Sequence, residues 1–337
     1  MSKSKYRALK MPVRYLINTV LVVLLFVGLQ LLSQNVLSTY QNKVLLLVGI
    51  NIILAVSLNV ATGYLGQLPL GHAGFMAVGA YTSALFTKYS TLPEPVAFAA
   101  GLILGAAVAC LFGVLIGIPA LRLSGDYLAI LTLGFGEIIR ITLNNIDNVL
   151  GFSLFYGAKG LKNIPKYSDL LSVFLCVVLT CFFIHTMLKS RHGRAVLAIR
   201  DNEIAAESCG IQTTYYKVMA FSFSAAFAGL AGGLYAGYLG VLDPSGFDFM
   251  KSIEILVMVV LGGMGSMLGS ILSATVLTIL PEALRSFSDY RMVLYSVVLI
   301  FMMIFRPGGL LGSYDFSLSR LISKALSFGS AKEAHHE

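Results

Sequence analysis

The chain has 337 residues, of which 57% are hydrophobic and 12% are charged. Because an ordinary soluble domain is about 25% charged, this composition excludes a soluble fold of this size. The formal net charge is +8, but the basic residues form short clusters between apolar runs, a pattern that favours membrane topology over nucleic-acid binding. We therefore expect the lipid bilayer as a partner, and no nucleic acid.

Apolar runs of about 20 residues, the length that crosses a bilayer, recur along the chain. Unpaired backbone groups are costly in hydrocarbon, so these runs are expected to be helical, and the alternating pattern of an outer-membrane barrel is not found. The predicted fold class is all-α, a polytopic membrane bundle of about nine to ten transmembrane helices with broken or re-entrant segments. The predicted spans are 15–32, 43–61, 70–88, 95–119, 127–143, 170–188, 215–240, 252–282 and 291–305.

The first predicted span, 15–32, follows a cluster of basic residues. Its apolar run is too long for a signal peptide, and no small-residue cleavage site follows it. We expect an uncleaved span whose basic end lies in the cytoplasm. The cluster consists of Lys3, Lys5, Arg7, Lys10 and Arg14.

The segment 62–74 interrupts two apolar runs with glycine, proline and uncharged polar residues. This composition predicts a broken helix. Non-helical backbone at membrane depth is tolerated only where protein or a water-filled cavity covers it, and in transporters such breaks often line the solute path. A single intramembrane histidine is more often a packing residue than a ligand or proton carrier. The candidate path residues here are Gly63, Gly66, Gln67, Gly71 and His72.

Charged side chains inside the predicted spans are few. Glu137 and Arg140 are three residues apart, so on a helix they share a face and can pair. Glu254 lies near the end of its span, where it can reach interfacial water. These isolated acids do not form the chain of carboxylates expected of a proton-coupled carrier, so proton coupling is disfavoured.

The loop 193–210 reads as a strong helix former that ends at a glycine. Asp201 and Asn202 can cap a helix whose body is 203–209, with Gly210 at its C-terminal end. An exposed helix between two spans can dock in a groove on a partner and move as a rigid piece. The alternative is that the charges of this loop only mark it as cytoplasmic and have no role in docking. The candidate coupling residues are Gly193, Arg194, Arg200, Asp201, Asn202, Glu203, Glu207 and Gly210.

Glycine has two structural roles in the C-terminal third. In the span 215–240 its spacing of three and four residues creates a face that lets helices approach closely. The run 252–282 would extend about 46 Å as one helix, against a hydrocarbon core of about 30 Å. Because glycines at its centre permit a bend, we predict two shorter helices there. The central glycines, which join the candidate path, are Gly262, Gly263 and Gly265.

The distribution of basic residues predicts the topology. With the N-terminus in the cytoplasm, the sixth span brings the basic loop 189–217 inside, and the Asn-rich segment 144–169 lies outside. If the run 252–282 crosses twice, the C-terminus also returns to the cytoplasm, so about ten crossings fit the charges better than nine. We expect one permease domain over 1–314 and a short cytoplasmic tail over 315–337.

Catalytic motifs are not found in the sequence. A transporter with its own motor needs the phosphate-binding loop GxxxxGK[ST], and the chain contains no Gly-Lys pair. HExxH and paired carboxylates are missing as well, so no catalytic residue, metal ligand or cofactor is predicted. The cysteines contain no CxxC pair and are expected to be packing residues. They are Cys110, Cys176, Cys181 and Cys209.

Several stretches together resemble the LivM-type permeases of high-affinity branched-chain amino acid importers, in the family's order and over nearly the whole chain. The resemblance implies a second, LivH-type membrane permease, two cytoplasmic ATP-binding subunits and a periplasmic amino acid binding protein as partners. It also implies that the loop 193–210 contacts the ATPase. The stretches are GYLGQLPLGHAGFMAVGAYTSA from Gly63, RLSGDYLAILTLGFGEIIRITLNN from Arg122, GRAVLAIRDNEIAAESCGI from Gly193, FAGLAGGLYAGYLG from Phe227, EILVMVVLGGMGSMLGS from Glu254 and FRPGGLLG from Phe305.

Two departures from the family pattern stand out. Pro69 occupies a position where the family more often has serine, and proline lacks an amide donor. The outer segment 147–165 lacks the usual Thr-Gly-Gly-rich loop.

The leading hypothesis is a permease subunit, in the bacterial inner membrane, of an ATP-driven importer for leucine, isoleucine and valine. Urea or short amides are alternative solutes, because the binding protein would set most of the selectivity. The broken helices alone also suit a stand-alone secondary carrier or channel. A membrane-embedded enzyme is a further class, but no motif supports it.

Overall fold

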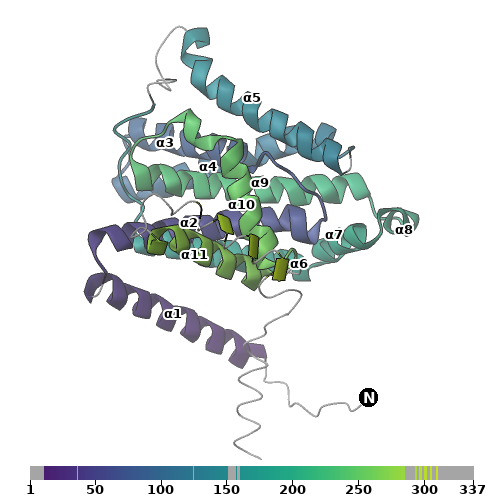
Figure 1. The fold of residues 1–337 in the computed structure, drawn as a ribbon, viewed down its shortest axis with the longest axis horizontal. Helices are drawn as coiled ribbons and strands as arrows, with labels where there is room; N and C mark the ends of the chain where they lie inside the picture. The colour runs from purple at the N-terminus through teal and green to yellow at the C-terminus, as the bar shows by residue number, and fades with distance from the viewer. Residues whose placement is uncertain are drawn as a thin grey trace, which may run out of the picture. The chain divides into compact units, whose positions relative to one another are not determined.

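The computed structural model describes residues 11–35, 37–123, 125–150, 157, 160–284, 293, 296–297, 300–301, 304–305 and 309. Over these ranges the chain is helical, with no β-strand beyond one isolated antiparallel bridge between Leu161 and Leu242. The predicted all-α class is confirmed. The helices, shown in Figure 1, are α1 (Met11–Asn35), α2 (Thr39–Asn59), the π-helix η1 (Val60–Tyr64), α3 (His72–Tyr89), α4 (Glu94–Ala120), α5 (Asp126–Leu150), α6 (Leu170–Lys189), α7 (Arg191–Asp201), α8 (Glu203–Ser208), α9 (Thr213–Leu239), the 3-10 helix η3 (Pro244–Phe247), α10 (Phe249–Gly262) and α11 (Met267–Ala283).

Four helices in the described part of the chain are long and apolar enough to cross a membrane. They are α2 with its π-helical end (Thr39–Tyr64), α4, α6 and α9. α5 runs beyond its predicted span of 127–143 and continues to Leu150. The tail 315–337 and parts of the predicted span 291–305 and of the segment 147–165 lie outside the described residues.

The chain divides into two compact units, one made of 1–42 with 314–337 and the other of 43–313. In the first unit, the side chain of Asn42 donates a hydrogen bond to the carbonyl oxygen of Ser33, 3.1 Å away, and so ties the end of α1 to the start of α2. All candidate site residues belong to the second unit.

The centre of the second unit is the packing of α3, α4 and α9 side by side (Figure 1). Small residues let these helices approach closely, because no side chain separates their backbones. A side chain at Gly229 would overlap Ala109, and one at Gly105 would lie 2.7 Å from the carbonyl oxygen of Gly79. Gly232 contacts the backbone of Met76 in the same way. The predicted close-packing face of the 215–240 helix is confirmed.

The predicted break in the run 252–282 is also confirmed. α10 ends at Gly262 and α11 begins at Met267, with Gly263 at φ +102° between them. The two helices form a tight pair, since a side chain at Gly262 would lie 2.5 Å from the backbone carbon of Gly269. The hydroxyl of Ser273 donates a hydrogen bond to the carbonyl oxygen of Met258 across the pair.

Candidate functional site

The first helix break follows α2. The helix widens into the π-helix Val60–Tyr64, and the amide of Leu65 donates to the carbonyl oxygen of Val60 at 3.1 Å. The backbone is then irregular up to His72, where α3 begins, with Gly66 at φ +77°. The broken helix predicted over 62–74 is therefore confirmed. Pro69 is buried within this irregular stretch.

The two glycine breaks meet in space, although about 200 residues separate them in sequence. Gly63 lies so close to Gly265 that a side chain at Gly63 would overlap the backbone there. Gly309 packs in the same way against Gly263. Three of the predicted path residues therefore form one junction of closely packed backbone, which we call the break junction: Gly63, Gly263 and Gly265.

Asn59 holds the break junction together. This buried side chain accepts a hydrogen bond from the amide of Gly265 at 2.9 Å. It also donates to the carbonyl oxygen of Ser266 at 3.1 Å and to the hydroxyl of Ser270 at 3.0 Å. Because these bonds satisfy backbone groups freed by the second break, Asn59 compensates for the lost helix there. Asn59 is not among the candidates predicted from the sequence, where its signal is a side-chain amide in an apolar run, directly before the first break.

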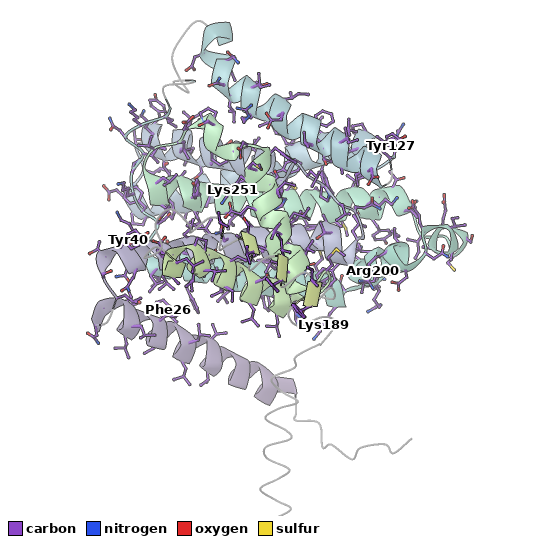
Figure 2. The ribbon with its side chains drawn as sticks, in the orientation of Figure 1. Phe26, Tyr40, Tyr127, Lys189, Arg200 and Lys251 are labelled. Carbon is purple, nitrogen blue, oxygen red and sulfur yellow. The ribbon has the colours of Figure 1, made fainter. Side chains whose placement is uncertain are left out.

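Arg200 lies at the end of α7 (Figure 2). From there it reaches the break junction. Its Nη1 donates a hydrogen bond to the carbonyl oxygen of Gly63 at 3.0 Å. Its aliphatic stem lies beside Gly66, where an added Cβ would lie 2.9 Å from the Arg200 Cγ. Its Nη2 lies 3.1 Å from the Asp201 carboxylate. Two separately predicted sets of residues, the path and the coupling loop, are thus in direct contact.

Among the other path candidates, the amide of Gln67 donates a hydrogen bond to the carbonyl oxygen of Ala61 at 2.9 Å, and Gly71 and His72 have different neighbours. The His72 ring Nε2 lies 3.0 Å from the Ser57 hydroxyl, and the ring is buried. Gly71 packs against the carbonyl oxygen of Thr132, whose hydroxyl accepts a hydrogen bond from the Leu70 amide at 3.0 Å. These contacts fit a packing role for His72, since its ring nitrogen already has a hydroxyl partner.

The 193–210 loop forms two helices, α7 and α8, which share Asn202 as a boundary. The Asn202 side chain caps α8 by accepting a hydrogen bond from the Ala205 amide at 3.0 Å, and Gly210 follows at φ +82°. The predicted cap and glycine end are confirmed, with Asn202 as the capping residue. α7 is anchored by its apolar face, because Val196 and Ile199 are buried against the end of α2 and its neighbours.

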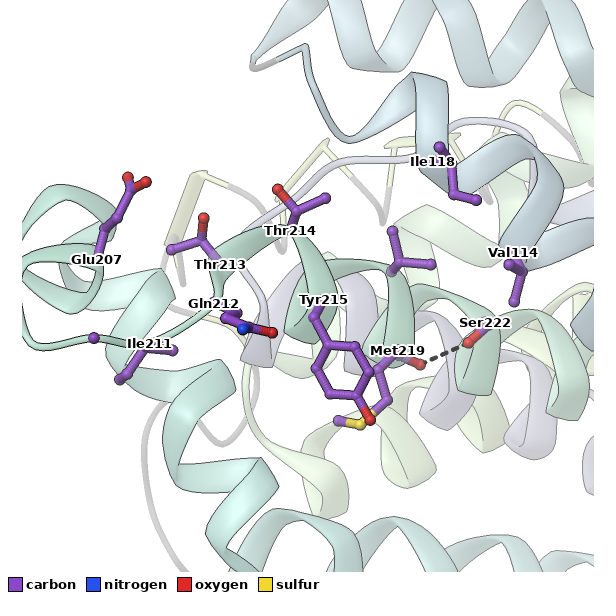
Figure 3. A pocket seen from close by; sticks show the side chains of 12 residues that line it. Val114, Ile118, Glu207, Ile211, Gln212, Thr213, Thr214, Tyr215, Met219 and Ser222 are labelled. Carbon is purple, nitrogen blue, oxygen red and sulfur yellow. Dashed lines mark hydrogen bonds between the residues drawn. The ribbon is translucent and has the colours of Figure 1, made fainter.

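α8, in contrast, projects from the bundle. Its Ile204 is 79% exposed, an unusual state for an isoleucine. One ion pair ties α8 to α9, where Lys217 Nζ lies 2.5 Å from Glu203 Oε1. Beside α8 lies an open groove of about 900 Å³ between α4 and the start of α9. Figure 3 shows Glu207 at one rim of this groove and Val114 and Ile118 at the other.

Ion pairs lie on two other helices. The Arg140 Nε and Nη2 both lie 2.8 Å from Glu137 Oε2 on α5, so the predicted pair is confirmed. Glu254 pairs with Lys251 at 2.9 Å on α10, and its side chain is 42% exposed.

Comparison with known proteins relates this arrangement to a family. Residues 40–306 match the profile of the branched-chain amino acid transport system permease component. The chain belongs to this permease family. It is 41% identical over 296 residues to the high-affinity branched-chain amino acid transport system permease protein LivM of Salmonella typhimurium strain LT2, a match that covers 78% of this chain and 68% of the relative. LivM of Escherichia coli strain K12 is 40% identical over the same shares.

The chain is also similar to LivH of Escherichia coli strain K12. The two are 34% identical over 126 residues, and the match covers 36% of this chain and 40% of the relative. No solved structure matches the chain. Family membership and the apolar helices identify a multi-pass membrane permease component.

Proposed function

We propose that this chain is the transmembrane permease subunit of an ATP-driven, high-affinity importer for leucine, isoleucine and valine. It crosses the bacterial inner membrane several times, with both termini in the cytoplasm, as the basic clusters favour. The branched-chain amino acid transport for which its LivM relatives are named supports the solute class. The mechanism is supported above all by the hydrogen bond from Arg200 to Gly63.

ATP binding and hydrolysis occur in two separate cytoplasmic subunits, since the chain has no phosphate-binding loop of its own. These subunits contact α7 and the projecting α8, and their motion displaces the pair of helices. Because Arg200 touches both glycine breaks, displacement of α7 reaches the break junction directly. Glycine-rich backbone can change conformation there without steric conflict, which opens the path alternately to each side.

The complete importer contains further subunits. A second, LivH-type permease forms the other half of the path, which is supported by the similarity of this chain to LivH itself. A periplasmic amino acid binding protein delivers the solute to the outer side. The path candidates from this chain are the residues of the break junction with Gly66, Gln67, Gly71, His72 and Gly262.

Reconstitution tests this proposal. The complete assembly is placed in liposomes with the loaded binding protein, and ATP hydrolysis is measured with leucine, with urea and without solute. Stimulation by leucine supports the permease function and its solute class. Stimulation by urea alone would support an ATP-driven importer but not the branched-chain amino acids as its solutes. The solute class would then be urea or short amides.

A stand-alone secondary carrier is the second candidate, because broken helices also occur in that class. The test is uptake by the purified chain alone in liposomes, driven by an ion gradient. Ion-driven uptake without any ATP-binding subunit would replace the importer proposal.

A further inference from the structure

A polar stripe runs along α5, on the flank between its buried and its exposed faces. Glu137, Arg140, Asn144 and Asp147 follow at spacings of three and four residues, which place them in one row on a helix. The packed face of α5 is different: Leu128, Thr132, Ile139 and Leu143 are buried there. A third face is apolar but exposed, with Tyr127 (labelled in Figure 2), Ile130, Ile138 and Ile141.

The central part of this stripe is an ion pair that is neither buried nor fully exposed. The Arg140 and Glu137 side chains are 31% and 28% exposed. They lie near the middle of a helix of 25 residues, which at about 1.5 Å per residue is long enough to cross the hydrocarbon core. Charged groups at that depth face a bundle interior or a water-filled cavity rather than lipid. α5 is not one of the four helices counted above as apolar enough to cross a membrane, but where a helix with such a pair does cross, the open side of the pair would face water rather than lipid.

The geometry of the pair suits one class of ligand. The Nε and Nη2 atoms of Arg140 both point at one oxygen of Glu137, Oε2. These two nitrogens form the edge of the guanidinium that can bind both oxygens of a carboxylate. An amino acid zwitterion carries a carboxylate for this edge and an ammonium group for the Glu137 carboxylate. Exchanging the internal pair for these two contacts brings no net charge into the membrane, so the exchange avoids most of the penalty of an unpaired ion.

We propose that the α5 stripe lines the solute path and that Glu137 and Arg140 bind the ammonium and carboxylate groups of the transported amino acid. This inference rests on the proposed function. It adds the site of contact, which the two glycine breaks do not supply because their backbone is already closely packed. The apolar side chain of Leu133, one turn before Glu137 on the same row of α5, suits a branched aliphatic side chain.

The first experiment neutralises the pair. The variant Glu137→Gln/Arg140→Gln is reconstituted in the complete importer with its binding protein, and leucine uptake per ATP hydrolysed is measured. We expect a fall of at least about tenfold, because charge-assisted hydrogen bonds to the solute are lost. The control Lys251→Gln/Glu254→Gln removes a pair of the same spacing from α10. Uptake per ATP should change there by no more than about twofold, the size of such a helix pair.

The second experiment measures water access without relying on transport. In a Cys209→Ser background, which removes an exposed thiol, Asn144→Cys on the stripe and Ile138→Cys on the apolar face are treated with a membrane-impermeant thiol reagent in the assembled complex. We expect labelling of Asn144→Cys at least about tenfold faster, since only the stripe faces water, and slower labelling when leucine-loaded binding protein is added.

The outcomes separate this inference from the proposed function. If the unmodified importer transports leucine but the neutralised variant does so equally well, or Asn144→Cys is not labelled, the α5 site is wrong and the importer function stands. If the unmodified importer transports no leucine, the proposed function itself fails, and the amino acid site fails with it.

Discussion

The guanidinium of Arg200 donates a hydrogen bond to the carbonyl oxygen of Gly63, 3.0 Å away and 137 residues distant in sequence. A charged side chain of the 193–210 loop is thereby bonded to a carbonyl that lies at a break in a membrane helix. Because α7 is otherwise held by apolar packing through Val196 and Ile199, this contact is a polar link between α7 and the break junction. It is the relationship on which the coupling proposal can be tested most directly.

Replacing Arg200 by glutamine should separate ATP hydrolysis from transport. Arg200→Gln removes the bond to Gly63 but keeps the Cβ and Cγ atoms that lie against Gly66, and the apolar anchor of α7 stays intact. We expect ATP hydrolysis to continue while leucine uptake per ATP falls about tenfold, in line with the loss of a charged hydrogen bond. Arg191→Gln is the matched control, since Arg191 is exposed at the opposite end of the same helix. Equal uptake in both variants would contradict the coupling role.

Exchanging the charges of Arg200 and Asp201 is a harsher test. The Arg200→Asp/Asp201→Arg variant can restore an ion pair between neighbours, but position 200 then presents a carboxylate to the Gly63 carbonyl. We expect the assembly to insert into the membrane and to lose solute-stimulated ATP hydrolysis. Membrane content by immunoblot and ATPase rate are the two measurements. Unchanged stimulation would remove this loop from the mechanism.

Asn59→Leu should destabilise the break junction. The substitution leaves the Gly265 amide, the Ser266 carbonyl and the Ser270 hydroxyl without the Asn59 partner inside the protein. We expect the free energy of unfolding to fall by about 1–3 kcal/mol, the penalty for unsatisfied buried polar groups. Thermal unfolding of the purified chain in detergent measures this fall.

Asn51→Leu is the control for that variant. Asn51 also lies on α2, but it donates a single side-chain hydrogen bond, to Thr278 at 2.9 Å. Its Oδ1 is buried without a hydrogen-bond partner, so replacing it removes an unsatisfied acceptor. A loss of stability as large as that of Asn59→Leu would refute the special role of Asn59.

Gly63→Ala should disrupt the meeting of the two breaks. The new methyl group would overlap the backbone of Gly265, which cannot rotate aside as a side chain can. We expect a loss of about 1–3 kcal/mol in the free energy of unfolding, typical of overpacking, together with loss of transport. Gly134→Ala on α5 is the control, because a methyl group there meets open space. Comparable stability of the two variants would show that the close approach is not required.

The sequence by itself determined the class of the fold and the positions of its irregularities. Apolar runs of bilayer length require helices, glycine and proline weaken them, and an asparagine before Glu203 caps a helix; each effect acts within a few residues. For that reason the break over 62–74, the division of the run 252–282 and the cap at Asn202 were predictable. The family motifs also indicated the family of the chain without any knowledge of its tertiary contacts.

Only the tertiary structure decided which of these local features meet. The contact of Gly63 with Gly265, the bonds of Asn59 and the reach of Arg200 join residues far apart in sequence. Exposure is also a tertiary property: the spacing of Glu137 and Arg140 predicted their pairing, but not that the pair stays partly exposed beside the packed face of α5. Helix-forming and helix-breaking signals are local, whereas the surface that a side chain meets depends on how all the helices pack.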